Sequence, residues 1–209
     1  EFESTVAAIF TDAADSYFTH EEIELSYDPV LEAKKHLVIG VQTYWFLDVG
    51  AKHDHSVLTG CYVQQDEREP RFQQVYCFLI HIYPQGYPLT RVAGSEIADN
   101  DGWHTEKSVK EYLDEYSVDG MRPVFGYDVT GNECMKALFQ SIAVDGEDVK
   151  FSLQKKSAMY QRLKYYMEKR LLHRVKSPQF NYQFGRLRVT KSKRGHLDII
   201  HHEKESDRD

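Results

Sequence analysis

The sequence predicts an α+β fold: one domain with a mainly antiparallel sheet, three to four helices, and a basic C-terminal helix followed by a hairpin. Three segments rich in β-branched and aromatic residues follow one another between residues 36 and 83. The links between them are short and polar, which is typical of an antiparallel meander. Apolar residues at helical spacing recur later in the chain and supply the helices that would cover this sheet.

The predicted meander consists of strands at 36–48, 56–64 and 72–83. The third strand is apolar on both of its alternating faces. Such a strand is expected near the centre of a sheet, covered by helix on at least one side.

The remaining elements follow from periodicity and from turn residues. A helix at 3–18 and a short strand at 22–27 are expected before the meander, with Asp28-Pro29 ending the strand. After the meander we expect helices at 106–117, 133–142 and 155–176, strands at 123–128 and 148–153, and a hairpin formed by 182–190 and 196–201.

A length of 209 residues fits one domain, which we place at residues 1–201, with a polar tail at 202–209. The first residue is Glu rather than Met, so we expect a processed product or a part of a longer protein. No apolar run approaches the roughly 18 residues of a membrane span, and no leader precedes the first helix. We therefore expect an intracellular protein, cytoplasmic or nuclear, that is neither secreted nor bound to a membrane.

Charge is divided sharply along the chain. Residues 1–149 carry 10 basic and 27 acidic residues, a net charge of −17, whereas residues 150–195 carry 14 basic residues and one acid, a net charge of +13. A block this basic predicts a positive surface patch that attracts polyanions. The alternative is that the acidic part packs beside the basic part and neutralises it.

The basic block offers two candidate surfaces for nucleic acid. Basic residues fall on one face of the helix expected at 155–176, and Arg186 and Arg188 alternate with apolar residues in the expected hairpin. Tyr182 is in phase with these arginines and could stack on a base. The candidate nucleic-acid-binding residues are Lys155, Arg162, Lys169, Lys176, Tyr182, Arg186, Arg188, Lys191, Lys193 and Arg194.

Signals for catalysis are weaker, because the common nucleotide-binding and hydrolase motifs are missing from the sequence. The best catalytic cluster is Asp99, Asp101, His104 and Glu106, whose carboxylates and imidazole could hold Mg²⁺ or Mn²⁺ in a nuclease. A polar loop before a helix explains the same residues. His53 and His55 with Cys61 form an incomplete zinc set, so we predict neither a metal site nor a cofactor.

The sequence therefore favours a non-catalytic module that binds RNA, DNA or single strands through its basic helix and hairpin at 155–194. A protein-interaction or assembly domain is the alternative, binding an acidic partner or another copy of the chain. A metal-dependent nuclease is the third hypothesis. Salt-dependent retention by nucleic acid, association without nucleic acid, and metal-dependent cleavage distinguish the three.

Overall fold

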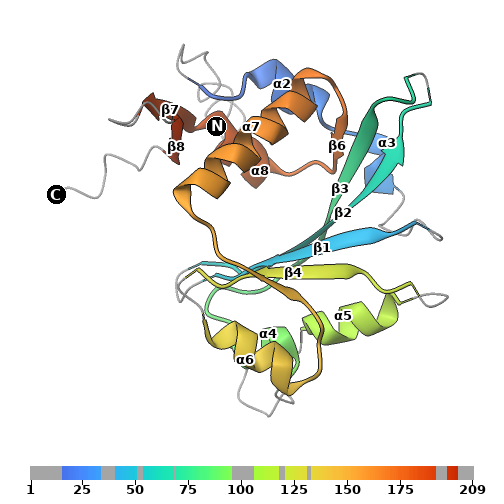
Figure 1. Ribbon diagram of the computed structural model, residues 1–209, viewed down its shortest axis with the longest axis vertical. Helices are drawn as coiled ribbons and strands as arrows, with labels where there is room; N and C mark the ends of the chain where they lie inside the picture. The colour runs from blue at the N-terminus through green and yellow to red at the C-terminus, as the bar shows by residue number, and fades with distance from the viewer. Residues whose placement is uncertain are drawn as a thin grey trace, which may run out of the picture. The chain divides into compact units, whose positions relative to one another are not determined.

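The computed structural model describes residues 16–33, 41–50, 54–67, 69–95, 106–117, 121–130, 133–191 and 197–201 (Figure 1). The chain divides into two compact units. Ala33–Phe151 forms one unit, and Glu1–Glu32 together with Ser152–Asp209 forms the other. The predicted single domain at 1–201 and the tail at 202–209 stay predictions.

The sheet of the Ala33–Phe151 unit is mixed, with the strand order β5-β4-β1-β2-β3. Strands β1, β2 and β3 are adjacent and antiparallel, which confirms the predicted meander. Strand β4 pairs in parallel with β1, and β5 pairs in parallel with β4. The prediction of a mainly antiparallel sheet was therefore wrong, because β4 and β5 are parallel to their neighbours. The strand bounds are Thr43–Asp48 for β1, Val57–Gln65 for β2, Gln73–Ile82 for β3, Val124–Asp128 for β4 and Glu147–Val149 for β5.

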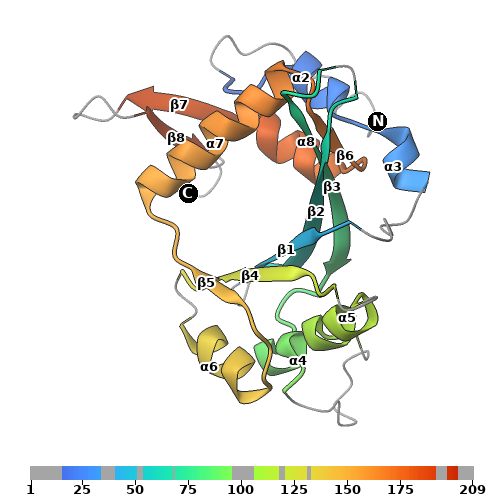
Figure 2. The same cartoon turned by 45° about the vertical axis from the view of Figure 1, so that its right-hand side comes forward.

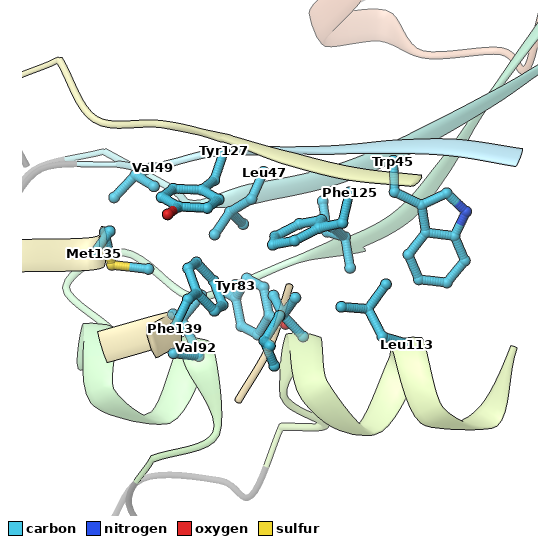
Figure 3. Close-up of a cluster of buried hydrophobic side chains, with 14 of the residues drawn as sticks. Trp45, Leu47, Val49, Tyr83, Val92, Leu113, Phe125, Tyr127, Met135 and Phe139 are labelled. Atoms are coloured by element: carbon cyan, nitrogen blue, oxygen red, sulfur yellow. The ribbon is translucent and has the colours of Figure 1, made fainter. Parts of the chain in front are cut away.

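The helices that follow β3 and β4 in this unit lie on one side of the sheet (Figures 1 and 2). They are α4 (Leu89–Ala93), α5 (Val109–Glu115) and α6 (Cys134–Ser141). Their apolar side chains pack with those of β1 and β4 in a core that includes Trp45, Leu47, Leu113, Phe125, Tyr127 and Phe139 (Figure 3). Burial of this apolar area is the main force that stabilises the unit.

Alternation along β1 separates two sets of side chains. Trp45 and Leu47 are buried against the helices, so Tyr44, Phe46 and Asp48 project from the opposite side. We call this opposite side the open face of the sheet.

The second unit contains the basic block. Its elements are α2 (His20–Leu25), α3 (Pro29–Ala33, the last residue of which lies across the unit boundary), α7 (Leu153–Glu168), β6 (Leu172–Arg174), α8 (Pro178–Gly185), β7 (Leu187–Lys191) and β8 (Leu197–His201). Helix α2 stands where a strand at 22–27 was predicted. The cause is a capping box, in which Thr19 and Glu22 satisfy each other's backbone N–H groups. The helix predicted at 3–18 lies almost entirely outside the described residues.

Two other predictions in this unit were wrong at their boundaries. The helix predicted at 155–176 ends at Glu168, because Arg170 adopts a left-handed conformation with φ of 56° and closes the helix. The hairpin predicted to start at 182 starts at Leu187. Before it, Ser177 caps α8 and Pro178 occupies its first turn, an arrangement that starts a helix.

Among the described residues, no helix has both the length and the apolar character needed to cross a membrane.

Candidate functional site

Two aspartates end neighbouring parallel strands of the sheet. Strands β1 and β4 pair in register up to Leu47 opposite Tyr127, so the next residues, Asp48 and Asp128, stand opposite each other. Adjacent strands lie about 4.8 Å apart, and both side chains project from the open face. Strand order reverses around β1, and the carboxyl ends of strands at such a point are where ligands bind in open α/β sheets.

Residues 54–56 lie close to the end of β1. A Cβ atom on Gly50 would lie 2.5 Å from the backbone carbon of His55 and 2.6 Å from the carbonyl oxygen of Asp54. The Gly50 N–H also donates to the Ser56 hydroxyl over 3.1 Å. The absence of a side chain at Gly50 therefore keeps the exposed Asp54 close to the strand end that carries Asp48.

The turn after β4 orients the second aspartate. The Thr130 N–H donates to Asp128 Oδ1 over 2.7 Å, and the Thr130 hydroxyl accepts the Phe151 N–H over 3.1 Å. This Asx turn fixes one carboxylate oxygen and leaves the other available to a ligand.

Asp148 in the next strand has a different role. It pairs with Tyr127, whose side chain faces the helices, so it projects from the helix-covered side. The Lys136 ammonium lies 2.9 Å from its carboxylate and holds the pKa of Asp148 below its ordinary value. Asp148 is therefore an exposed ion-pair partner on the other side of the sheet from Asp48 and Asp128.

The donor set at the open face suits a hard divalent cation. Within the described ranges, no group of three or more His, Cys, Asp or Glu side chains is arranged so that it could hold a metal ion. Asp48 and Asp128 alone still fit Mg²⁺, which is commonly held by one or two carboxylates, with water and substrate phosphates completing its shell. These two residues are the ones that would hold a metal here.

The catalytic cluster predicted from the sequence is not assembled in the described residues. Asp99, Asp101 and His104 lie outside them. Glu106 Oε2 lies 3.1 Å from His81 Nε2, and His81 also contacts the Tyr112 hydroxyl of α5 over 3.3 Å. Glu106 therefore lies on the helix-covered side, away from Asp48 and Asp128. Of the zinc set considered above, His55 bonds the Tyr83 carbonyl through Nδ1 over 2.8 Å, and His53 is outside the described residues.

The structure describes most, but not all, of the residues predicted to bind nucleic acid, and their role stays a prediction. Lys155, Arg162 and Lys169 are exposed along α7 and its C-cap, and no described carboxylate forms an ion pair with them. Lys176 is exposed but lies beyond the end of the helix. Of the last three predicted cations, Lys191 is described only through its backbone in β7, and Lys193 and Arg194 lie outside the described residues.

Tyr182 was predicted in the first strand of the hairpin, in phase with Arg186 and Arg188, and that placement was wrong. Tyr182 lies in α8, where the Arg186 guanidinium stacks 5.0 Å above its ring and donates to its hydroxyl. Arg188 donates to the carbonyls of Gly185 and Leu187 over 2.9 and 3.2 Å. Both arginine side chains therefore already contact other groups of this chain.

Neutralisation inside the second unit is also visible. Lys164 lies 2.9 Å from Glu22, and Arg170 lies 3.8 Å from Glu21. Glu1–Glu32 and Ser152–Asp209 together carry 15 basic and 15 acidic residues, so this unit has no formal net charge. Its cations are therefore a local patch on a neutral body.

Sequence reasoning missed Asp48 and Asp128. Each ends a β-rich segment and is followed within three residues by glycine, at Gly50 and Gly131. This local pattern can be read from the sequence, but the parallel pairing of β1 with β4 cannot.

No protein-family model and no curated protein matches this sequence. Solved structures do match its fold. The large terminase nuclease from thermophilic phage G20c aligns at 11% identity with bound cobalt (TM-score 0.56) and at 12% with bound magnesium (TM-score 0.53). Each alignment covers 80% of this chain and 76% of the nuclease. The HK97 bacteriophage large terminase aligns at 10% identity with a TM-score of 0.55, over 88% of this chain and 39% of that protein.

These likenesses overturn the interpretation as a non-catalytic RNA-binding module. The matched structures are those of terminases, described in the G20c case as nucleases, which is the activity named in the third hypothesis. The hypothesis of a protein partner stays a prediction. In its fold, this chain resembles the nuclease domains of phage large terminases.

Proposed function

We propose that this protein is a metal-dependent nuclease that acts on DNA, with Asp48 and Asp128 as the carboxylates that hold the divalent cation. The observation that carries the proposal is the register of β1 and β4, which brings two aspartates together at the carboxyl ends of parallel strands. The likeness to nucleases with bound magnesium and cobalt supports it.

The chain's own residues have defined tasks in such a reaction. Asp48 and Asp128 would hold the cation, and the Thr130 N–H orients the Asp128 carboxylate for that role. The cation, when bound, polarises a phosphate oxygen and lowers the pKa of its water. The Asp54 backbone lies close to Gly50 at this strand end, so Asp54 is a candidate to accept a proton or a hydrogen bond from water.

The exposed cations of α7 are the second part of the proposal. Lys155, Arg162 and Lys169 recur every seven residues, so they follow one side of the helix at intervals of about 10 Å. Cations spaced in this way contact the phosphate backbone without reading bases. They would supply affinity for DNA but no sequence preference.

The experiment that tests the site compares three variants. Asp48→Asn and Asp128→Asn should each lower the rate of plasmid cleavage in Mg²⁺ or Mn²⁺ at least about 100-fold. Loss of a residue that only supports a metal ligand already costs about 10–100-fold. Asp148→Asn is the matched control, because it changes the same group one strand away on the opposite side of the sheet. It should keep the wild-type rate.

Circular dichroism should show that all three variants stay folded, and a chelator should abolish wild-type cleavage. Wild-type cleavage rates in both Asn variants would contradict the assignment of these residues. An absence of cleavage by the wild-type protein with each of the two metals would contradict the proposed activity itself.

A further inference from the structure

Two cysteines face each other on the adjacent strands β2 and β3. Cys61 of β2 and Cys77 of β3 are direct partners in the antiparallel register, and no disulfide joins them. Both are half-buried. On its other side, Cys61 pairs with Tyr44, which places it on the open face.

The hydrogen-bond pattern of these strands sets the separation of the two cysteines. The Asp66 N–H donates to the Phe72 carbonyl over 2.9 Å, which marks Asp66 and Phe72 as a hydrogen-bonded pair. Such pairs alternate along an antiparallel ladder, and the register is unbroken from Gln65 back to Thr59. The Cys61–Cys77 pair lies five residue pairs from the Asp66–Phe72 pair, which is an odd number. The two cysteines therefore form a non-hydrogen-bonded pair, with Cα atoms about 4.5 Å apart.

This separation lies within the range that a disulfide bond spans, about 4.4–6.8 Å between Cα atoms. The side chains of non-hydrogen-bonded pairs are also the closer ones on a sheet. The Cys77 thiol hydrogen-bonds with the Cys61 sulfur and lowers the pKa of Cys61 below its ordinary value, although burial opposes this shift. Geometry and chemistry thus both favour a reactive pair.

We propose that Cys61 and Cys77 are a site of thiol oxidation that reacts with a small-molecule disulfide and closes into a cross-strand disulfide between β2 and β3. This proposal does not rest on the nuclease function. It concerns strands of the sheet that carry neither Asp48 nor Asp128.

The reaction is an ordinary thiol–disulfide exchange. The Cys61 thiolate attacks one sulfur of glutathione disulfide, forms a mixed disulfide and releases one glutathione thiolate. The Cys77 thiolate then attacks the Cys61 sulfur and releases the second glutathione. The two protein thiols lose two protons and two electrons, and one glutathione disulfide is reduced to two glutathione thiols.

The test uses the full chain carrying Cys134→Ser, because Cys134 is exposed and would react by itself. The protein is equilibrated in buffers of increasing glutathione disulfide, alkylated and weighed by mass spectrometry. We expect the protein to lose two hydrogens and both alkylation sites together, with no glutathione retained. Peptide mapping should find Cys61 joined to Cys77, and the melting temperature should rise, because the bond restricts the unfolded chain.

Two further variants make the result decisive. Cys61→Ser and Cys77→Ser, each in the Cys134→Ser background, should retain one thiol that accepts a single glutathione. Persistence of both thiols in buffers that modify Cys134 of the otherwise unchanged chain would overturn the proposal. So would a stable glutathione adduct on Cys61 beside an unreacted Cys77, or disulfides formed only between two chains.

Discussion

Gly60 lies beneath the Phe78 ring on the helix-covered side of the sheet. A Cβ atom at this position would lie 2.5 Å from two atoms of that ring and 3.1 Å from the Trp45 ring. Phe78 and Trp45 are only 3% exposed, so neither ring can swing into solvent. The position therefore requires a residue without a side chain, for reasons of packing rather than of backbone conformation.

The substitution Gly60→Ala should lower the free energy of unfolding by about 1–3 kcal/mol, the usual cost of overpacking a core. Gly126→Ala is the matched control, because its Cβ would meet its nearest neighbour at 3.4 Å on the open face. Its effect should stay within about 0.5 kcal/mol. Urea unfolding midpoints measure both, and equal midpoints for the two variants would contradict the packing argument.

Single residues also show where sequence reasoning reaches its limit. Burial of Trp45, Phe78 and Phe139 follows from apolar patterning, which depends on neighbours in the chain. The juxtaposition of Asp48 and Asp128 depends on two strands 80 positions apart pairing in parallel. No local pattern encodes that pairing, so the two aspartates of the candidate site could be noticed but not joined.

At the scale of elements, the ends of the helices explain most of the errors in prediction. Ser177-Pro178 directly follows the helix predicted at 155–176, but in the structure it starts α8. Arg170 closes α7 in a conformation that sequence patterns assign to glycine. The strands of the meander were easier to predict, because β-rich segments with short links have few other ways to pair.

The start of α5 provides a prediction about pH. The Ser108 N–H and hydroxyl both lie 2.7 Å from Glu111 Oε2 and lower the pKa of Glu111 below its ordinary value of 4.5. This carboxylate therefore stabilises the fold fully above pH 4.5, and the contribution is lost as the pH falls through its lower folded pKa. Glu111→Gln should be less stable than the wild type near neutrality, and the difference should shrink in acid.

Thermal unfolding at several pH values measures this difference. Glu69→Gln is the control, because Glu69 pairs with Arg71 in an exposed loop. Its difference from the wild type should stay within about 0.5 kcal/mol at every pH. A Glu111→Gln defect that stays constant down to strongly acidic pH would contradict the role of the ionised carboxylate.

At the scale of the whole molecule, the charge runs of the sequence do not coincide with the compact units. Nine acidic residues before position 33 belong to the same unit as the basic block, and together with the six acidic residues of Ser152–Asp209 they cancel its net charge. Affinity for DNA would then depend on particular exposed cations rather than on a generally positive body. This distinction can be measured.

Replacing Lys155, Arg162 and Lys169 together with Gln should weaken DNA binding and flatten its dependence on salt. The slope of log K against log salt should fall by roughly 0.7–0.9 for each lost phosphate contact. The matched control replaces Lys107, Lys110 and Lys136, each of which is paired with a carboxylate. Fluorescence anisotropy over a salt series compares the two, and an equal loss of slope would show that net charge alone matters.

The second unit joins the two ends of the chain, and this arrangement has a consequence during synthesis. Glu22 of α2 meets Lys164 of α7 across 142 positions. A ribosome adds about 5–20 residues per second, so α2 waits roughly 7–28 s for its partner. The whole of Ala33–Phe151 emerges in that interval and can fold first. The side chains of Phe18 and Ile23 are buried in the folded protein. On the nascent chain they stay exposed to chaperones and proteases during this interval.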